Sequence, residues 1–152
     1  QIVFEVRQEK NPCSLCSNLR RGALNRVAKR YNCNKVALGH HLDDVVHTLF
    51  MSILYENRFH VFKPSTYLSR ADITMIRPLI YVEEKDIRMF VETMGIKTVK
   101  NLCPADNQTK RQEIAELFDN IEKLHPGIRK HIVASLENVG PDCFWNPQKI
   151  KP

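Results

Sequence analysis

Two cysteines near the start of the chain have the spacing of metal ligands. Cys13 and Cys16 are three positions apart, so their thiols can hold one metal ion or the edge of a metal cluster. Cys103 comes much later and is a candidate third thiol. Three thiolates leave one metal position open, which is typical of a reactive site rather than a closed structural one. The alternatives for the pair are a structural zinc and a redox couple.

A polar cluster, His40-His41-Leu42-Asp43-Asp44, stands where a predicted strand gives way to a predicted helix. Ligand-facing residues gather at such turns in doubly wound folds. Two carboxylates could hold Mg²⁺ on the phosphates of a nucleotide, and Asp43 or Asp44 could act as a base or orient a nucleophile. The alternative is that one aspartate only caps the helix. His47, one turn beyond Asp43, could join the site, but a solvated helix face is expected for it.

Several basic residues are candidates for binding anions. Arg20 lies one helical turn after Cys16, where a guanidinium can stabilise a thiolate or bind a phosphate. Arg77 ends a predicted strand, and Lys110 and Arg111 begin a predicted helix, so these three are candidate phosphate ligands. For most other Lys and Arg residues, a solvated surface position is expected.

The hydrophobic periodicity predicts strands alternating with helices. Strands are predicted over residues 2–6, 35–38, 73–76 and 96–99, and a loop over 55–72. Helices are predicted from about 13 to 31, 42 to 54, 83 to 94, 109 to 124 and 128 to 139. In the first helix, one apolar face is expected to be buried: Cys16, Leu19, Ala23, Leu24, Val27, Ala28 and Tyr31. This order predicts an α/β fold with a parallel sheet covered by helices and a site at the carboxyl ends of its strands.

Composition narrows the function classes. The 152 residues are 43% hydrophobic and 26% charged, as in a soluble globular protein, and no apolar run approaches the ~20 residues of a membrane helix. We therefore expect a cytoplasmic protein with no membrane partner. The net charge of +6 favours a polyanionic partner such as nucleic acid, the alternative being a solvated basic surface. Five cysteines without secretory features favour metal binding or catalysis over disulfides.

The start of the chain suggests that a segment precedes it. The chain begins at Gln1 and enters a predicted strand at once, so we expect its natural start to lie upstream. The five glycines never cluster, so this chain contains no phosphate-cradling loop.

Taken together, the motifs resemble the TtcA-type tRNA 2-thiocytidine synthetases of the PP-loop ATPase superfamily. The resemblance runs from about Phe4 to Leu124. It is carried by Cys13-Ser14-Leu15-Cys16, Leu19-Arg20-Arg21-Gly22, Gly39-His40-His41-Leu42-Asp43-Asp44, Ile76-Arg77-Pro78-Leu79, Asn101-Leu102-Cys103 and Arg111-Gln112.

The resemblance implies a Rossmann-like fold of the adenine nucleotide alpha hydrolase type, here incomplete at the N-terminus. Residues 1–140 would be the C-terminal portion of a PP-loop ATPase domain that ends in two helices, and 141–152 a loose tail. It also implies ATP with Mg²⁺, and a [4Fe-4S] cluster on Cys13, Cys16 and Cys103. The His-His-x-Asp-Asp motif of such proteins lies at the nucleotide site, which corresponds to His41, Asp43 and Asp44 here.

The implied reaction is tRNA thiolation. ATP adenylates an oxygen of a tRNA base, and sulfur from a separate donor then replaces the adenylate. Asp43 and Asp44 would place the metal, and Arg20 would steady the negative charge at sulfur. Splitting one difficult step into two in this way is a common use of activation. Cytidine 2-thiolation is the expected reaction, and a homodimer is left open.

Two departures from the family pattern stand beside this expectation. The Ser-Gly-Gly-x-Asp-Ser phosphate loop of the family is missing, so the chain alone is expected to bind ATP poorly and to be inactive. Pro104-Ala105-Asp106 after Cys103 also differs from the usual pattern, which leaves the target base open. The rival functions are a zinc-stabilised RNA-binding module without catalysis, and a PP-loop ATPase with a substrate other than tRNA.

Overall fold

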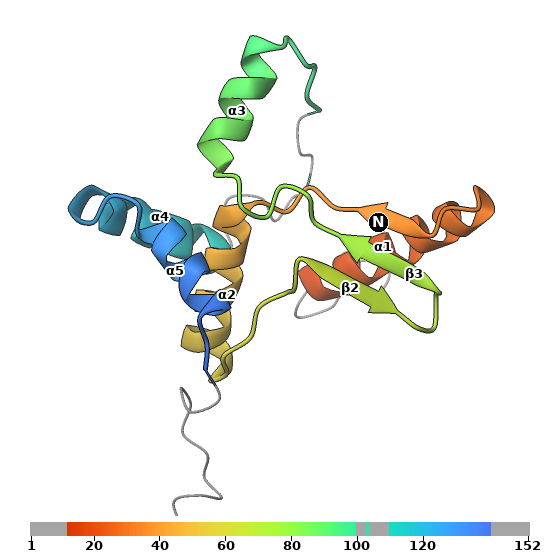
Figure 1. Cartoon of the computed structure of the whole chain (residues 1–152), viewed down its shortest axis with the longest axis horizontal. Helices are drawn as coiled ribbons and strands as arrows, with labels where there is room; N and C mark the ends of the chain where they lie inside the picture. The colour runs from red at the N-terminus through yellow and green to blue at the C-terminus, as the bar shows by residue number, and fades with distance from the viewer. Residues whose placement is uncertain (1–11, 100–102, 104–109, 141–152) are drawn as a thin grey trace, which may run out of the picture. The chain divides into compact units, whose positions relative to one another are not determined.

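The computed structural model describes residues 12–99, 103 and 110–140, which form two compact units (Figure 1). Unit 1 comprises Gln1–Gly39 and Lys63–Pro78, and unit 2 comprises His40–Phe62 and Leu79–Pro152. The predicted strand over 2–6, the start of the helix at Thr109 and the tail over 141–152 lie outside the described residues. The prediction of a single domain over 1–140 stays a prediction.

Unit 1 is a three-stranded sheet with one helix. The helix α1 spans Pro12–Arg30, and the strands are β1 (Lys35–Ala37), β2 (Ser65–Leu68) and β3 (Ile73–Ile76). Figure 1 shows β3 between the other two strands, parallel to β1 and antiparallel to β2. The α/β class is confirmed, but the sheet is mixed, and only its β1–β3 pair is parallel.

The strand β2 contradicts the predicted loop over 55–72. It pairs with β3 through a tight turn in which Asp72 has a φ of 49°, a left-handed conformation that Asp tolerates better than most residues. On β3 the side chains alternate, so that Ile73 and Met75 are buried while Thr74 and Ile76 are half-buried. The residues of β2 are half-exposed or exposed, and a four-residue strand of that kind carries too weak a hydrophobic pattern to predict.

The predicted buried face of α1 is wrong for most of its residues. Ala28 is buried, whereas Leu19, Leu24, Val27 and Tyr31 are exposed, Tyr31 at 73%. Within unit 1, α1 contacts β1 near its own C-terminal end, where Cys33 donates its backbone N–H to the carbonyl of Ala28. The periodicity predicted the helix correctly, but the packing partner of its apolar face does not follow from periodicity.

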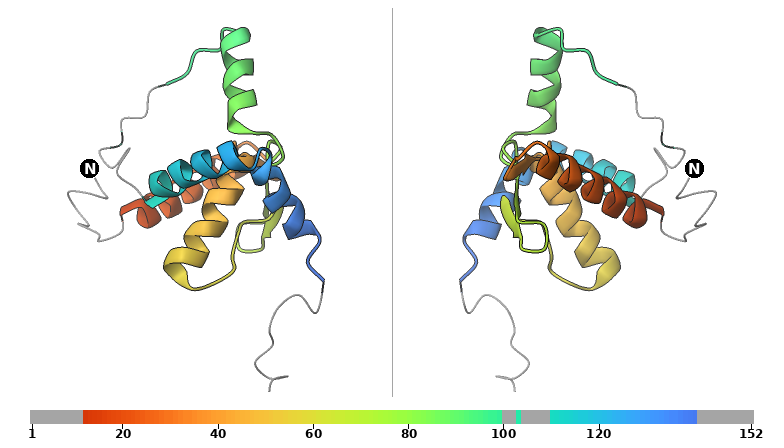
Figure 2. Two further views of the ribbon diagram at one scale, coloured as in Figure 1. Left: turned by 90° about the vertical axis from the view of Figure 1, so that its left-hand side faces the viewer. Right: turned by 90° about the vertical axis from the view of Figure 1, so that its right-hand side faces the viewer.

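Unit 2 is built on three mutually packed helices. They are α2 (Leu42–Glu56), α4 (Lys110–Leu124) and α5 (Ile128–Glu137), and Figure 2 shows α4 and α5 beside α2. Their core is an apolar cluster, in which the rings of Phe50 and Phe118 meet edge to face at 4.6 Å between centroids. The buried members of the cluster are Leu42, Val45, Val46, Ile80, Ile114, Phe118 and Val133.

Two other predictions in unit 2 are corrected by the structure. The helix α3 (Glu84–Thr93) forms as predicted and stops before Gly95, which has a φ of 62°. However, no residue of α3 is buried, and the predicted core residues Phe90 and Met94 are exposed. Residues 96–99 form no strand, and Val99 is 95% exposed. Among the described helices, none is long and apolar enough to cross a membrane.

Candidate functional site

The first turn of α2 holds the predicted polar cluster. His41 is the N-cap residue, with extended backbone angles, and Asp44 accepts a hydrogen bond from its backbone N–H at 3.2 Å. Asp43 and Asp44 therefore lie in the first turn, where carboxylates offset the positive end of the helix dipole. Asp44 therefore caps α2, which is the role that the sequence left open for one of the two aspartates.

Asp43 caps a different helix. Its Oδ2 accepts the backbone N–H of Glu84, the first residue of α3, at 2.7 Å. The N-cap residue of α3, Glu83, makes no capping bond of its own, and its buried carboxylate pairs instead with Lys85 and Lys130, both at 2.6 Å. Asp43 thus connects the starts of α2 and α3, which are far apart in the sequence.

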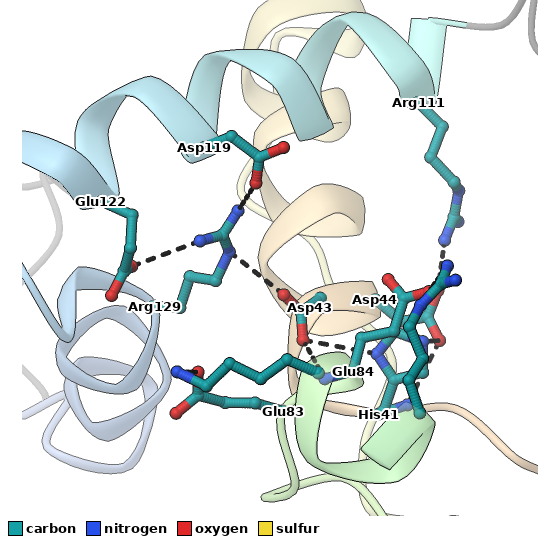
Figure 3. A network of polar contacts seen from close by, with 11 residues as sticks. His41, Asp43, Asp44, Glu83, Glu84, Arg111, Asp119, Glu122 and Arg129 are labelled. Carbon is teal, nitrogen blue, oxygen red and sulfur yellow. Dashed lines mark hydrogen bonds and ion pairs between the residues drawn. The ribbon is translucent and has the colours of Figure 1, made fainter. Parts of the chain in front are cut away.

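The other carboxylate oxygen of Asp43 contacts a buried arginine of α5, Arg129 (Figure 3). The Nε of Arg129 lies 3.1 Å from Oδ1 of Asp43, an ion pair without the alignment of a hydrogen bond. Its Nη2 donates to Asp119 at 2.6 Å and its Nη1 to Glu122 at 3.3 Å. Because Arg129 is only 8% exposed, its charge depends on these three carboxylates of α2 and α4 for compensation.

Asp44 has its own cationic partner. The Nη1 of Arg111 donates to Oδ1 of Asp44 at 2.6 Å, and its Nη2 lies 3.5 Å from the hydroxyl of Thr48. Figure 3 shows Arg111 reaching from α4 to the start of α2. With Arg129 and Glu84 on Asp43, and Arg111 and the N–H of His41 on Asp44, all four carboxylate oxygens already have an N–H or cationic partner.

The protonation of this cluster follows from its contacts. Burial works against ionisation of Asp43, but His41, the N–H of Glu84 and Arg129 together lower its pKa from 3.8 to about 2. Burial also opposes charge on His41, yet Asp43 and Asp44, at 3.6 and 3.4 Å, raise its pKa above 6.5. Asp43 is therefore ionised at neutral pH, and the imidazole of His41 has a pKa above its ordinary value.

His47 behaves in the opposite way. It lies one turn beyond Asp43 and is buried, contrary to the expected solvated face. Burial and the charge of Arg111 lower its pKa below 6.5, although Asp43 and Asp44 act against this. Its Nε2 has no hydrogen-bond partner among the described residues, so a neutral imidazole is favoured.

The cysteines lie in both units. Cys13 and Cys16 occupy the first turn of α1 as free thiols, exposed and half-exposed, and the i, i+3 spacing places them on one face of the helix. Arg20 follows one turn later and is exposed. Cys103 belongs to unit 2 and is exposed.

The remaining predicted phosphate ligands are held by their neighbours. Arg77 follows β3 in unit 1, donates to the carbonyl of Lys63 at 2.6 Å and has its pKa lowered by burial and by Arg21. Lys110 begins α4 in unit 2 and pairs with Glu113 at 2.8 Å, and its Nζ lies 5.3 Å from the centre of the Tyr55 ring.

Comparison with protein families identifies the domain. The model of the PP-loop domain family matches residues 7–120. The chain belongs to the PP-loop domain family. The resemblance drawn from the sequence motifs is therefore confirmed at the level of the family.

Curated relatives of this PP-loop chain are tRNA-modifying enzymes. Proteins named tRNA-cytidine(32) 2-sulfurtransferase from Dechloromonas aromatica and Geotalea uraniireducens are 38% and 39% identical over 141 and 145 residues. The one from Sorangium cellulosum is 35% identical over 146 residues. The matches cover 92%, 92% and 95% of this chain but 49%, 57% and 52% of the relatives, so the chain spans about half of their length.

A solved structure shares the fold of the PP-loop chain. It is the U34-tRNA thiolase NcsA from Methanococcus maripaludis, described with its [4Fe-4S] cluster. The TM-score is 0.70 at 31% sequence identity, and the match covers 86% of this chain and 44% of that one.

The acidic pair at the start of α2 does not fit a magnesium ion as it stands. Asp43 and Asp44 do not offer free oxygens as they stand, and Mg²⁺ requires oxygen ligands in near-ideal octahedral geometry. Among the described residues, no three His, Cys, Asp or Glu side chains are grouped as a metal ion would require, and this applies to the cysteines as well as to the carboxylates. Cys13 and Cys16 are accessible thiols without disulfide partners, and thiolates are the ligands of iron–sulfur clusters.

Arg129 is the residue of this site that sequence reasoning missed. A signal was present, because Arg129 stands four residues before the buried Val133 and seven before the half-buried Leu136, on the apolar face of α5. An arginine on such a face requires buried carboxylate partners. Which carboxylates those are, on α2 and α4, is set only by the packing of the helices.

Proposed function

We propose that this chain is part of an ATP-dependent tRNA sulfurtransferase that replaces an oxygen of a tRNA base by sulfur. The observation that carries the proposal is the similarity to relatives named tRNA-cytidine(32) 2-sulfurtransferase, at 35% to 39% identity over more than nine-tenths of the chain. Cytidine is the proposed target. The U34-tRNA thiolase fold, at 31% identity, makes uridine the second candidate.

In this proposal Cys13, Cys16 and Cys103 hold a [4Fe-4S] cluster. Such a cluster with three protein ligands supplies one open iron at which sulfur can be bound. The chain provides two of the thiol ligands, Cys13 and Cys16, at the N-terminal end of α1. Arg20, one turn from Cys16, offsets the negative charge of the bound cluster and its thiolate ligands.

The nucleotide-binding residues remain proposed as a set: His41, Asp43, Asp44, Arg77, Lys110 and Arg111. We assign Asp43 and Asp44 a positioning role, because their oxygens contact Arg129, Arg111 and backbone N–H groups. They fix the first turns of α2 and α3 and hold Arg111 in place. ATP enters as a substrate that activates the base oxygen, and a separate donor supplies the sulfur. A tRNA substrate accords with a cytoplasmic protein, and we leave open whether it acts as a homodimer.

The cluster assignment is tested by anaerobic reconstitution with iron and sulfide. The wild-type protein is expected to bind four irons and four sulfides, and Cys16→Ser and Cys103→Ser to lose most of them. Cys33→Ser is the matched control, because Cys33 is also a free, exposed thiol and its sulfur only donates to the carbonyl of Tyr31. A cluster that survives in Cys103→Ser contradicts the assignment. Colourless protein that holds zinc favours the RNA-binding module instead.

The reaction is tested by mass spectrometry of tRNA nucleosides from a strain that lacks the gene. We expect 2-thiocytidine to disappear and to return on complementation with the wild-type gene but not with the Cys16→Ser gene. Loss of 2-thiouridine instead would move the target to uridine. A complete set of thionucleosides in the deletion strain contradicts tRNA thiolation and favours a PP-loop ATPase with another substrate.

A further inference from the structure

The two units differ sharply in charge. The described part of unit 1 has nine basic residues and a single acidic one, Asp72, which gives a formal charge of +8. The basic residues are Arg20, Arg21, Arg26, Lys29, Arg30, Lys35, Lys63, Arg70 and Arg77. All but Arg77 are exposed. The described part of unit 2 has nine basic and twelve acidic residues.

The pairing of these charges differs even more. In unit 2, seven of the nine described basic residues form ion pairs: Arg58, Lys85, Arg88, Lys110, Arg111, Arg129 and Lys130. In unit 1, the eight exposed basic residues form no ion pair with any described carboxylate, and Asp72 accepts only from Tyr67. The excess charge of the protein therefore lies in unit 1 and is not neutralised there by described side chains.

The densest part of this charge lies on α1. The helix contains no Asp or Glu in its 19 residues. Arg26, Lys29 and Arg30, here called the basic triplet, stand at i, i+3 and i+4, so their side chains are neighbours on the helix surface. Like charges at this spacing repel one another. A row of bound phosphates would neutralise them, and the counterions released from the phosphates would favour binding.

We propose that unit 1 binds the phosphate backbone of the tRNA, with the basic triplet of α1 as a main contact. This inference rests on the proposed tRNA substrate and adds the surface that holds it. Two of the three side chains are guanidinium groups, which bind phosphate oxygens with paired N–H groups. Backbone contacts position the RNA without reading its sequence, so the surface contributes affinity and register rather than choice of base.

The test compares two triple variants of the chain for binding of an unmodified tRNA transcript. In R26Q/K29Q/R30Q the basic triplet is neutralised, with Gln as a good helix former. In the control, R58Q/K85Q/R88Q, three exposed basic residues of unit 2 are neutralised, each of which is paired with a carboxylate. Both variants lose three charges, so they differ only in where the charge was and whether it was paired. Circular dichroism verifies that both variants are folded.

The readout is the dependence of the dissociation constant on salt, measured by fluorescence anisotropy. Each lost phosphate contact lowers the slope of log K against log salt by about 1. The triplet variant is expected to lose about 2 to 3 from the slope and to bind at least about tenfold more weakly at physiological salt. The control is expected to lose less than about 1. If the triplet variant does not fold, Arg26→Gln alone is measured, with an expected loss of about 1.

Three outcomes separate the possibilities. The proposed surface is overturned if tRNA binding weakens equally in both triple variants, or if the salt slope of the triplet variant is unchanged. In either case, tRNA binding by the wild type still supports the proposed function. Failure of the wild type to bind tRNA contradicts the proposed function itself. Triplet-dependent binding to anionic phosphatidylserine vesicles without binding to tRNA overturns the RNA assignment and identifies a membrane surface instead.

Discussion

Nine basic residues accompany a single carboxylate in the described part of unit 1, whereas the described part of unit 2 has nine basic and twelve acidic residues and most of its basic residues form ion pairs. The two patterns have different physical consequences. A paired, buried charge such as that of Arg129 holds helices together, and its loss destabilises the fold. An exposed, unpaired charge such as that of Arg26 contributes little to stability and is available to a polyanion. Charge therefore holds the fold together in unit 2, whereas in the described part of unit 1 it is left exposed, where we propose that it binds RNA.

The largest expected effect is the difference in stability between removing a buried, paired arginine and removing an exposed, unpaired one. Arg129→Ala leaves the buried Asp43 without its main cation and is expected to lower the free energy of unfolding by ~3 kcal/mol. Arg26→Ala, the matched change in unit 1, is expected to alter it by less than ~0.5 kcal/mol. Urea unfolding followed by circular dichroism measures both. Similar losses in the two variants would remove the distinction between the units.

A smaller effect is expected from the charge of Asp43 at low pH. Its pKa is about 2 in the folded chain against 3.8 for the free side chain, so its ionised form is stabilised by folding. That contribution, discounted for partial solvent exposure to ~1–2 kcal/mol, is fully present above pH ~4 and is lost as the pH falls toward 2. Asp43→Asn still accepts the Glu84 N–H bond but lacks the charge.

The urea midpoints of wild type and Asp43→Asn should therefore differ at pH 6 and converge near pH 2. Asp72→Asn is the control in unit 1, since Asp72 accepts a hydrogen bond from Tyr67 and pairs with no described cation. A constant gap between wild type and Asp43→Asn across this range contradicts the ionic role of Asp43.

The smallest effect concerns two histidines of α2 near neutral pH. All six histidines of the chain belong to unit 2, so histidine titration can report on that unit alone. His41 has a raised pKa, so the stability it contributes is full below pH 6.5 and is lost as the pH rises through its folded value. His47 has a lowered pKa, so its contribution is present above pH 6.5 and is lost as the pH falls through its folded value.

Replacing each histidine by Gln should tilt the curve of stability against pH in opposite directions between pH 5 and 8. Each change is expected to be of order 1 kcal/mol or less, because both shifts are partly balanced by opposing causes. Urea midpoints at four or five pH values are sufficient to measure the tilt. If both variants change the slope of stability against pH in the same direction, the opposite pKa shifts of His41 and His47 are contradicted.

Much of the local structure followed from the sequence. The period of the apolar residues located α2, α3, α4 and α5 and the strands β1 and β3, because backbone hydrogen bonding and one buried face are encoded within each segment. The acidic pair at the start of α2 was recognised as a capping candidate, since N-terminal turns favour carboxylates wherever the helix is placed. The set of six motifs, with the cysteine pair and the His-His-x-Asp-Asp stretch among them, indicated the PP-loop family, which the family comparison confirms.

What the sequence could not supply were the partners of each segment. The strand β2 forms by pairing with β3, whereas residues 96–99 pair with no strand among the described residues. Asp43 and Asp44 appeared in the sequence as free metal ligands, yet Arg129 and Arg111 arrive from helices 67 or more residues away and occupy them. The sequence by itself determined which residues carry charge and which of them lie in the first turn of a helix. Only the tertiary structure decided which charges meet, because ion pairing depends on a few ångströms between segments that the chain order leaves independent.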